Sequence, residues 1–190
     1  MGGDIQISSE LIELCQRGDM RAFRSLVEQL KRPAYFHALA LLGNHDDALD
    51  VSQEAFARAW ISLASYDRTL PFYPWYYTIL KRLSLNLIRS RKRRREVHDA
   101  DAHLNGQAGS DSPEADRQAR YRIAQVRQAL KQLSVDDREI ICLKDMQDYT
   151  YREIAAILDI PVGTVMSRLY GARARFRKLM QETGYEHTSP

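Results

Sequence analysis

Aromatic and basic residues are concentrated in one stretch of the sequence, and side chains of these types could bind unpaired nucleic-acid bases. Residues 72–77 contain five aromatic residues, and residues 81–95 contain eight basic residues and no acidic one. An aromatic ring can stack on a base with about 1–3 kcal/mol, while neighbouring cations bind the phosphates. Pro71 and Pro74 interfere with helix formation, so we expect a stiff aromatic loop, followed by a helix from about Trp75.

The same rings also fit a second interpretation, in which they belong to a hydrophobic core. Trp75 begins an apolar stripe that continues to Leu87 at helical spacing, which favours burial of this ring. For Phe72, Tyr73 and Tyr76 the sequence supports both interpretations, a base-stacking surface and a core position.

The segment Tyr151–Arg173 has the residue pattern of a helix-turn-helix. Residues 150–153 (TYRE) have the form of a capping box, which predicts the start of a helix. Residues 159–161 (DIP) predict a tight turn, because Asp tolerates the left-handed backbone conformation. Val165 and Leu169 are four residues apart, so both would pack the second helix against the first.

The rest of that second helix is polar and basic. Residues 163–178 contain five basic residues and no acidic one. The residues expected to face outward are Thr164, Ser167, Arg168 and Arg173. Such a helix fits the major groove of B-DNA, where an arginine can bond to O6 and N7 of guanine together. The alternative interpretation is a solvated face of a helical bundle.

An acidic and polar strip occupies a third segment. Asp46, Asp50, Gln53 and Glu54 share one face of an expected helix. Phosphates would repel this strip, so we expect a protein partner with basic groups. A solvated helix face is the alternative.

The composition sets limits on the class of protein. The chain has 190 residues, a net charge of +3 and a pI of about 8.9. It has no run of 18 apolar residues and no secretory pattern at its N-terminus, so we expect a cytoplasmic protein without membrane insertion. Cys15 and Cys142 are far apart and lie in apolar patterns, which predicts buried thiols and no zinc site. We find no motif for catalysis, so no catalytic residue, metal or cofactor is predicted.

Hydrophobic periodicity predicts an all-α protein with two small helical domains. The first domain is expected over residues 1–95, with helices that end at Gly18, Gly43 and about Ser62, and with a kink at Pro33. Residues 96–117 hold six acidic residues and little apolar surface, which predicts a flexible acidic linker. The second domain is expected over residues 118–190.

Three motifs, in order, resemble the sigma-70 family of bacterial transcription initiation factors, in its extracytoplasmic-function (ECF) group. Residues 47–60 (DALDVSQEAFARAW) are similar to the family's core-polymerase-binding helix. Residues 74–79 (PWYYTI) and the following basic helix look like its segment that reads the −10 promoter element. Residues 151–155 (YREIA) and 162–169 (VGTVMSRL) are similar to its −35-reading helix-turn-helix.

The resemblance implies partners and binding residues for each motif. It implies docking on the β′ clamp helices and β flap of core RNA polymerase, capture of a flipped −10 base by the loop 67–74, and an anti-sigma factor that covers both surfaces. The implied polymerase-binding residues are Asp46, Asp47, Asp50, Gln53, Glu54, Phe56 and Arg58. The implied −10 residues are Phe72, Tyr73, Trp75, Tyr76, Lys81, Arg82, Asn86 and Arg89. The implied −35 residues are Tyr151, Arg152, Thr164, Ser167, Arg168, Arg173 and Arg175. Met166 and Gly171 stand where basic residues are common in the family, which predicts an unusual −35 sequence.

Two hypotheses from different classes follow. In the first, the protein directs core RNA polymerase to specific promoters and helps to melt the −10 element. In the second, it is a helix-turn-helix regulator that binds duplex DNA and never docks on polymerase. Co-purification with core polymerase separates the two.

Overall fold

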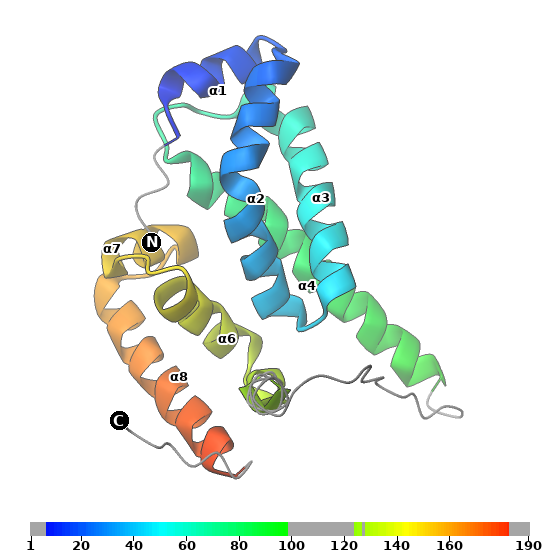
Figure 1. The fold of residues 1–190 in the computed structure, drawn as a ribbon, viewed down its shortest axis with the longest axis vertical. Helices are drawn as coiled ribbons and strands as arrows, with labels where there is room; N and C mark the ends of the chain where they lie inside the picture. Colours follow the sequence, from blue (N-terminus) through cyan, green and yellow to red (C-terminus); the bar gives the residue numbers. More distant parts are fainter. Residues whose placement is uncertain (1–6, 99–123, 127, 183–190) are drawn as a thin grey trace, which may run out of the picture.

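The computed structural model describes residues 7–98, 124–126 and 128–182, and within these ranges the chain is helical without strands (Figure 1). The elements of the first half are α1 (Ser9–Gln16), α2 (Met20–Leu42), α3 (His45–Ser62), the 3₁₀ turn η1 (Leu63–Ser65) and α4 (Phe72–His98). Those of the second half are α6 (Val135–Ile141), the π-helical turn η2 (Cys142–Met146), α7 (Tyr151–Leu158) and α8 (Val162–Glu182). Residues 124–126 and 128–132 are also helical. The all-α prediction is confirmed for these residues.

Local capping groups set the helix starts in the first half. Side-chain oxygens of Ser8, Asp19 and Asn44 accept hydrogen bonds from the free backbone N–H groups at the starts of α1, α2 and α3. Gly43 ends α2 in the left-handed conformation, with φ +68°. Helix α2 runs through Pro33 as a single element.

The start of α4 differs from the expectation. The helix begins at Phe72, so residues 72–77 form its first turns and the prediction of an aromatic loop with a helix from Trp75 is wrong. Pro74 is tolerated because it lies in the first turn, where a backbone N–H has no partner within the helix. At the other end α4 continues to His98, and residues 99–117 of the expected linker lie outside the described residues.

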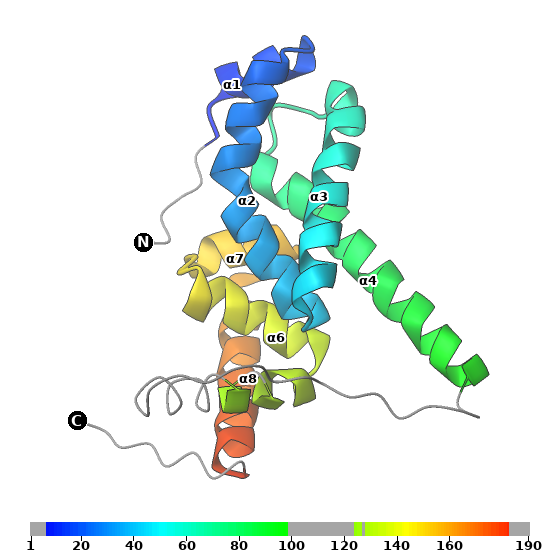
Figure 2. The ribbon, with the colours of Figure 1, turned by 45° about the vertical axis from the view of Figure 1, so that its right-hand side comes forward.

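The core of the first half forms where α2 packs against α1, α3 and α4 (Figure 2). Leu26 and Leu30 of α2 and Leu63 of η1 are fully buried there. Tyr76 and Tyr77 of α4 are the largest fully buried side chains. The aromatic segment is therefore part of the core.

The second half is a helix-turn-helix with an additional helix, α6, packed on α8. Val165 and Leu169 of α8 are buried, as their spacing predicts, and they pack with the buried Ile154 of α7. The capping box is present in both directions between Thr150 and Glu153. Asp159 turns the chain in the left-handed conformation, with φ +52°. This part of the prediction is confirmed.

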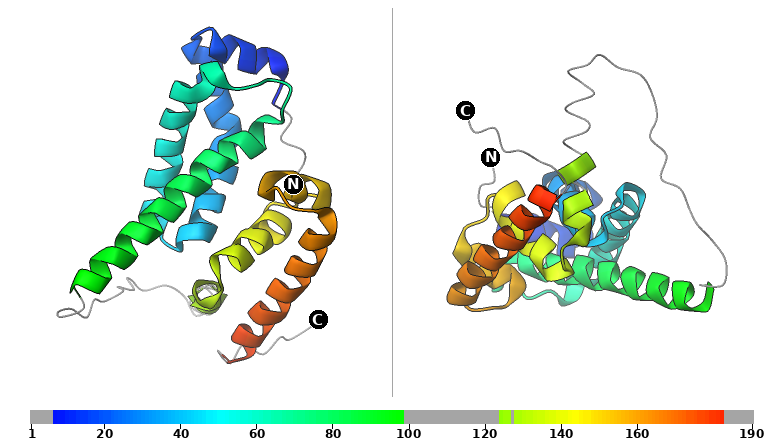
Figure 3. Two further views of the ribbon diagram at one scale, coloured as in Figure 1. Left: turned by 180° about the vertical axis from the view of Figure 1, so that it is seen from behind. Right: turned by 90° about the horizontal axis from the view of Figure 1, so that it is seen from below.

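The two halves are in contact. Helix α6 lies against the C-terminal part of α2, and α7 contacts the start of α4 (Figure 3). Both halves contribute buried residues to one continuous hydrophobic cluster. In this arrangement the second half covers part of the aromatic and basic helix α4.

Candidate functional site

The exposed side of α3 carries most of the expected polymerase-binding residues. Asp46, Asp50, Gln53 and Glu54 are exposed and lie one or two turns apart. Arg58 is also exposed, and its Nε donates a hydrogen bond of 2.7 Å to Glu54. A partner can therefore reach this acidic strip, defined here as residues 46, 50, 53 and 54, without any change in the fold.

Two residues of that expected set face the interior. Asp47 is buried and forms a bidentate ion pair with Arg91 of α4, with a distance of 2.5 Å from Nη2 to Oδ1. Phe56 is buried and stacks on Tyr76, with ring centroids 4.9 Å apart. Both side chains hold α3 against α4, so neither presents a free surface in this conformation.

The expected stacking surface on α4 is also internal. Phe72, Tyr73 and Tyr76 are 6%, 5% and 0% exposed, and Trp75 is half-buried against Tyr66. Of the two interpretations left open for these rings, a base-stacking surface does not fit this conformation. The reason is that residues 72–77 are helical, and the helix places Phe72, Tyr73, Tyr76 and Tyr77 on the side that faces the bundle. These rings are core residues, which is the second interpretation.

The basic face of α4 is the part of that segment that remains accessible. Arg82, Asn86 and Arg89 are exposed on one side of the helix, at i, i+4 and i+7. Within the described part of the chain, Arg82 and Arg89 have no carboxylate partner. Lys81 differs, because its Nζ lies 2.9 Å from Oε1 of Glu139 in the second half.

Glu139 is the centre of a polar junction between the halves. Its side chain is 3% exposed, and it accepts hydrogen bonds from the Tyr77 hydroxyl and from Lys81. Burial raises the pKa of Tyr77, and the carboxylate of Glu139 raises it further. Next to Glu139, Arg138 donates a 3.1 Å hydrogen bond to the Leu41 carbonyl at the end of α2, where a cation is favourable.

A buried histidine completes this junction. His37 of α2 lies among the rings of Tyr73, Tyr77 and Tyr149. Its Nδ1 shares a 2.5 Å hydrogen bond with the Tyr73 hydroxyl. Burial lowers the pKa of His37 to about 3, so the ring is neutral near pH 7. No local sequence pattern indicates His37, Tyr149 or Glu139, because their partners are far away in the sequence.

The outward side of α8 is only partly free. Ser167 and Arg168 are exposed and Thr164 is half-buried. Arg173 is paired with Asp145, with 3.1 Å from Nε to Oδ2, and Arg175 with Asp137, with 2.7 Å from Nε to Oδ2. Hydrogen bonds to these carboxylates raise the pKa of both arginines.

These pairs change the accessibility of two members of the expected −35 set, whose role in DNA binding stays a prediction. The acid-free segment 163–178 predicts that Arg173 is a free outward cation, and the resemblance adds Arg175 to the set. The compensating carboxylates come from elsewhere in the second half, on α6 and η2. Arg168 has no carboxylate partner in the described ranges and remains the free cation of the predicted set on α8.

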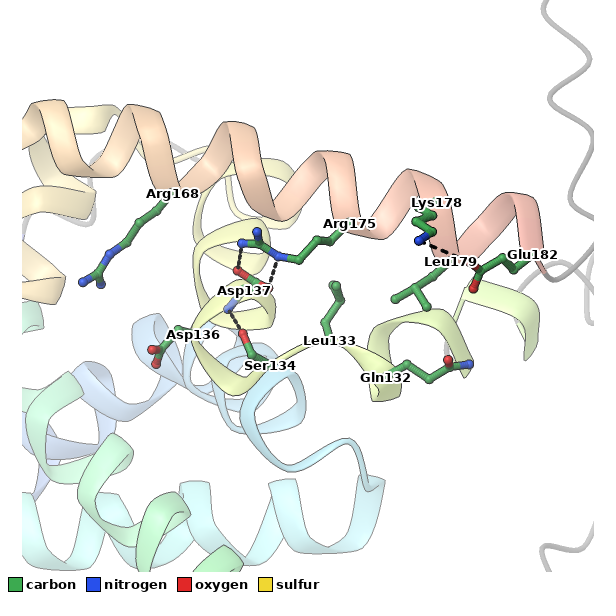
Figure 4. A pocket seen from close by; sticks show the side chains of 10 residues that line it. All are labelled: Gln132, Leu133, Ser134, Asp136, Asp137, Arg168, Arg175, Lys178, Leu179 and Glu182. Carbon is green, nitrogen blue, oxygen red and sulfur yellow. Dashed lines mark hydrogen bonds and ion pairs between the residues drawn. The ribbon is translucent and has the colours of Figure 1, made fainter.

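A groove of about 690 Å³ separates α8 from residues 132–137 (Figure 4). Arg168 and Lys178 line it from one side and Asp136 from the other, and the ion pair of Arg175 and Asp137 crosses it. The groove therefore has charges of both signs. Among the described residues no group of His, Cys, Asp and Glu could hold a metal ion.

The start of α7 holds the last two expected residues. Tyr151 is half-buried, and Lys144 Nζ lies 5.9 Å from its ring centroid. Arg152 is exposed and lines a hollow between α7 and the start of α4. In the described part of the chain, no helix alone has the length and apolar character to cross a membrane; α7 and α8 meet that test only as a pair bent by 98°.

The comparisons with known proteins match both halves. Residues 26–94 match the family model of sigma-70 region 2, and residues 123–176 match that of sigma-70 region 4. The chain is 32% identical over 179 residues to the RNA polymerase sigma-H factor of Pseudomonas aeruginosa, covering 90% of this chain and 93% of that protein. The chain belongs to the sigma-70 family. It is a transcription initiation factor of the ECF group.

Other similar proteins agree with this assignment. The sigma factor is 34% identical over 174 residues to the ECF RNA polymerase sigma-E factor of Escherichia coli, covering 86% of this chain and 88% of that protein. Its fold is similar to that of CnrH, solved in complex with the cytosolic domain of CnrY (TM-score 0.68, 25% identity, 91% of this chain and 96% of that chain). It is also similar to the sigma factor RpoE of Bartonella quintana, solved with the anti-sigma factor NepR (TM-score 0.66, 25% identity, 85% and 98%).

Proposed function

We propose that this sigma factor makes three separate contacts during initiation. The acidic strip on α3 docks on core RNA polymerase, at the β′ clamp helices. The basic face of α4 holds the −10 element, and the outward side of α8 holds the −35 element. The observation that carries this proposal is that three exposed faces lie on three different helices. The face on α3 is acidic and those on α4 and α8 carry free arginines, and each helix lies largely within a segment that matches sigma-70 region 2 or region 4.

The −10 contact is proposed for the part of α4 that solvent reaches. Arg82, Asn86 and Arg89 are available without rearrangement. Lys81 and Tyr73 become available only when the second half leaves α4, since Lys81 is held by Glu139 and Tyr73 is buried beside Tyr149. We therefore propose that full −10 engagement requires the two halves to separate.

The proposal includes an anti-sigma factor as a partner. The similar structures were solved with CnrY and with the anti-sigma factor NepR bound. By that likeness, a partner of this kind would cover the polymerase-binding and promoter-binding faces. The protein would act through binding alone, without a catalytic step of its own, in the cytoplasm where polymerase works.

The test is promoter-directed transcription with purified core polymerase. The parent protein is expected to give a promoter-dependent run-off transcript, and D50K/E54K is expected to abolish it and to lose core polymerase in co-purification. Glu28→Lys is the matched control, because Glu28 is an exposed acid on α2 outside the acidic strip. A transcript that is unaffected by D50K/E54K would refute the docking role of α3.

Duplex binding by the protein alone tests the alternative regulator. A sigma factor is expected to bind promoter duplex poorly until core polymerase is added. Tight sequence-specific binding without core, together with no transcript, would favour the regulator.

A further inference from the structure

Two large apolar side chains stand exposed on the recognition helix α8. Met166 is 53% exposed and Tyr170 is 80% exposed, the highest value among the exposed large hydrophobic residues of the described chain. They are four residues apart, so they are neighbours on one side of the helix. Val162, one turn earlier, is 39% exposed on the same side.

This apolar stripe, Val162–Met166–Tyr170, is distinct from the side of α8 that packs on its own domain. Val165, Leu169 and Ala172 face the core and are at most 2% exposed. The fold therefore leaves the stripe in water, and only another molecule could cover it. The cations of α8 that have no carboxylate partner in the described chain, Arg168 and Arg177, indicate an anion as that molecule.

DNA presents few apolar groups in the groove that a helix can enter. Of the base edges in the major groove, only thymine offers an apolar group, its C5-methyl. The other edges present hydrogen-bond donors and acceptors, which Met166 can satisfy only weakly, through its thioether sulfur, and which Tyr170 can satisfy only with its hydroxyl. The exposed side of α8 therefore matches thymine better than any other base.

We propose that Met166 and Tyr170 read thymine methyl groups within the −35 element, so that this sigma factor selects thymine at the base pairs that these two side chains contact. The inference rests on the proposed contact of α8 with the −35 element.

The expected effect follows from the size of the contact. Removing one buried methyl-sized group from an interface costs about 0.8 kcal/mol, which corresponds to about a four-fold loss of affinity. Replacing thymine by deoxyuridine removes this methyl alone and leaves the base pair intact. The substitution is therefore a selective probe of the proposed contact.

The experiment uses the full chain assembled with core polymerase. A promoter library randomised in the −35 element first identifies the preferred sequence, and each thymine in it is then replaced by deoxyuridine, one at a time. We expect about a four-fold loss of affinity at one or two adjacent positions. Met166→Ala should abolish the loss at one of these positions and Tyr170→Ala at the other, while Tyr170→Phe should retain it.

The matched control is Met20→Ala, which removes an exposed methionine of α2 that is 62% exposed and lies outside the proposed DNA contacts. It should keep full sensitivity to deoxyuridine. The polymerase could select a −35 sequence and yet bind it with unchanged affinity when deoxyuridine replaces each thymine. That result would overturn methyl reading and leave the −35 role of α8 standing. If no −35 sequence is selected at all, both the inference and the proposed −35 contact are overturned.

Discussion

Glu139→Ala should loosen the junction between the two halves of the sigma factor. The substitution removes the only carboxylate that the described residues give to Lys81, and it removes the acceptor of the buried Tyr77 hydroxyl. An orphaned buried hydroxyl costs about 1–3 kcal/mol. Breaking a fully buried ion pair costs about 3–5 kcal/mol, and less here because the Lys81 side chain is 31% exposed. We expect the arrangement in which the two halves are in contact to lose about 3 kcal/mol of stability in total, relative to the arrangement in which they are separate.

The thiol of Cys142 reports on this change. Cys142 is fully buried beside the junction, and its Sγ lies 3.5 Å from the Phe36 carbonyl oxygen of α2. Burial raises the pKa of this thiol to about 12, so it reacts only after it is exposed. In a Cys15→Ala background, a loss of about 3 kcal/mol is expected to speed labelling of Cys142 by a disulfide reagent roughly 100-fold.

Two variants sharpen the interpretation. Glu139→Gln retains an acceptor for Tyr77 and removes only the charge, so its labelling rate should rise less, roughly ten-fold. Glu182→Ala should leave the rate unchanged, because the exposed Glu182 lies 4.0 Å from Lys178 in a weak surface pair. A rate for Glu139→Ala within three-fold of the parent rate would refute the idea that this carboxylate holds the halves together.

Three further predictions concern stability. The pKa of His37 is about 3 in the folded protein against an ordinary value of 6.5, so the unfolded chain binds the extra proton and stability falls as pH drops below 6.5. The loss should be about 2 kcal/mol between pH 8 and pH 5 in urea unfolding, and a His37→Gln variant with the same loss would contradict this cause. Gly171→Ala should raise the free energy of unfolding by about 0.5–1 kcal/mol, since the new Cβ meets only the Arg175 guanidinium, at 3.3 Å, and a small shift of that group relieves the contact; a decrease would show that the ion pair with Asp137 keeps the guanidinium from shifting. Thr150→Ala should lower the free energy of unfolding by about 1 kcal/mol, and with it the melting temperature, because it removes the N-cap of α7. An unchanged melting temperature would show that the cap contributes nothing.

Features set by neighbouring residues could be predicted from the sequence. The capping box at Thr150 and Glu153 joins residues three positions apart, and Val165 and Leu169 lie one turn apart on a single helix. The Gly43 end of α2 needs only its own backbone conformation. In each case the controlling interaction lies within one or two turns, so the local pattern was sufficient.

Features that depend on distant partners were not predictable in this way. Glu139 and Lys81 are 58 positions apart, and only the packing of the two halves brings them together. Arg173 lies in a segment without acids, yet Asp145 reaches it from η2, 28 positions earlier. The role of the aromatic segment could not be decided for another reason, since the same residue types serve to stack on a base and to fill a core.

The ion pairs within the fold bear on how the protein responds to salt. When a free cation binds a phosphate, the DNA releases a counterion, and affinity then falls as salt rises. Arg173 and Arg175 already hold carboxylates, as does Arg91, so contact with DNA would exchange one anion for another. Within the described chain, Arg82, Arg89 and Arg168 have no carboxylate partner. The slope of affinity against ionic strength should therefore follow this smaller set of arginines and be shallower than the basic composition of the helices suggests.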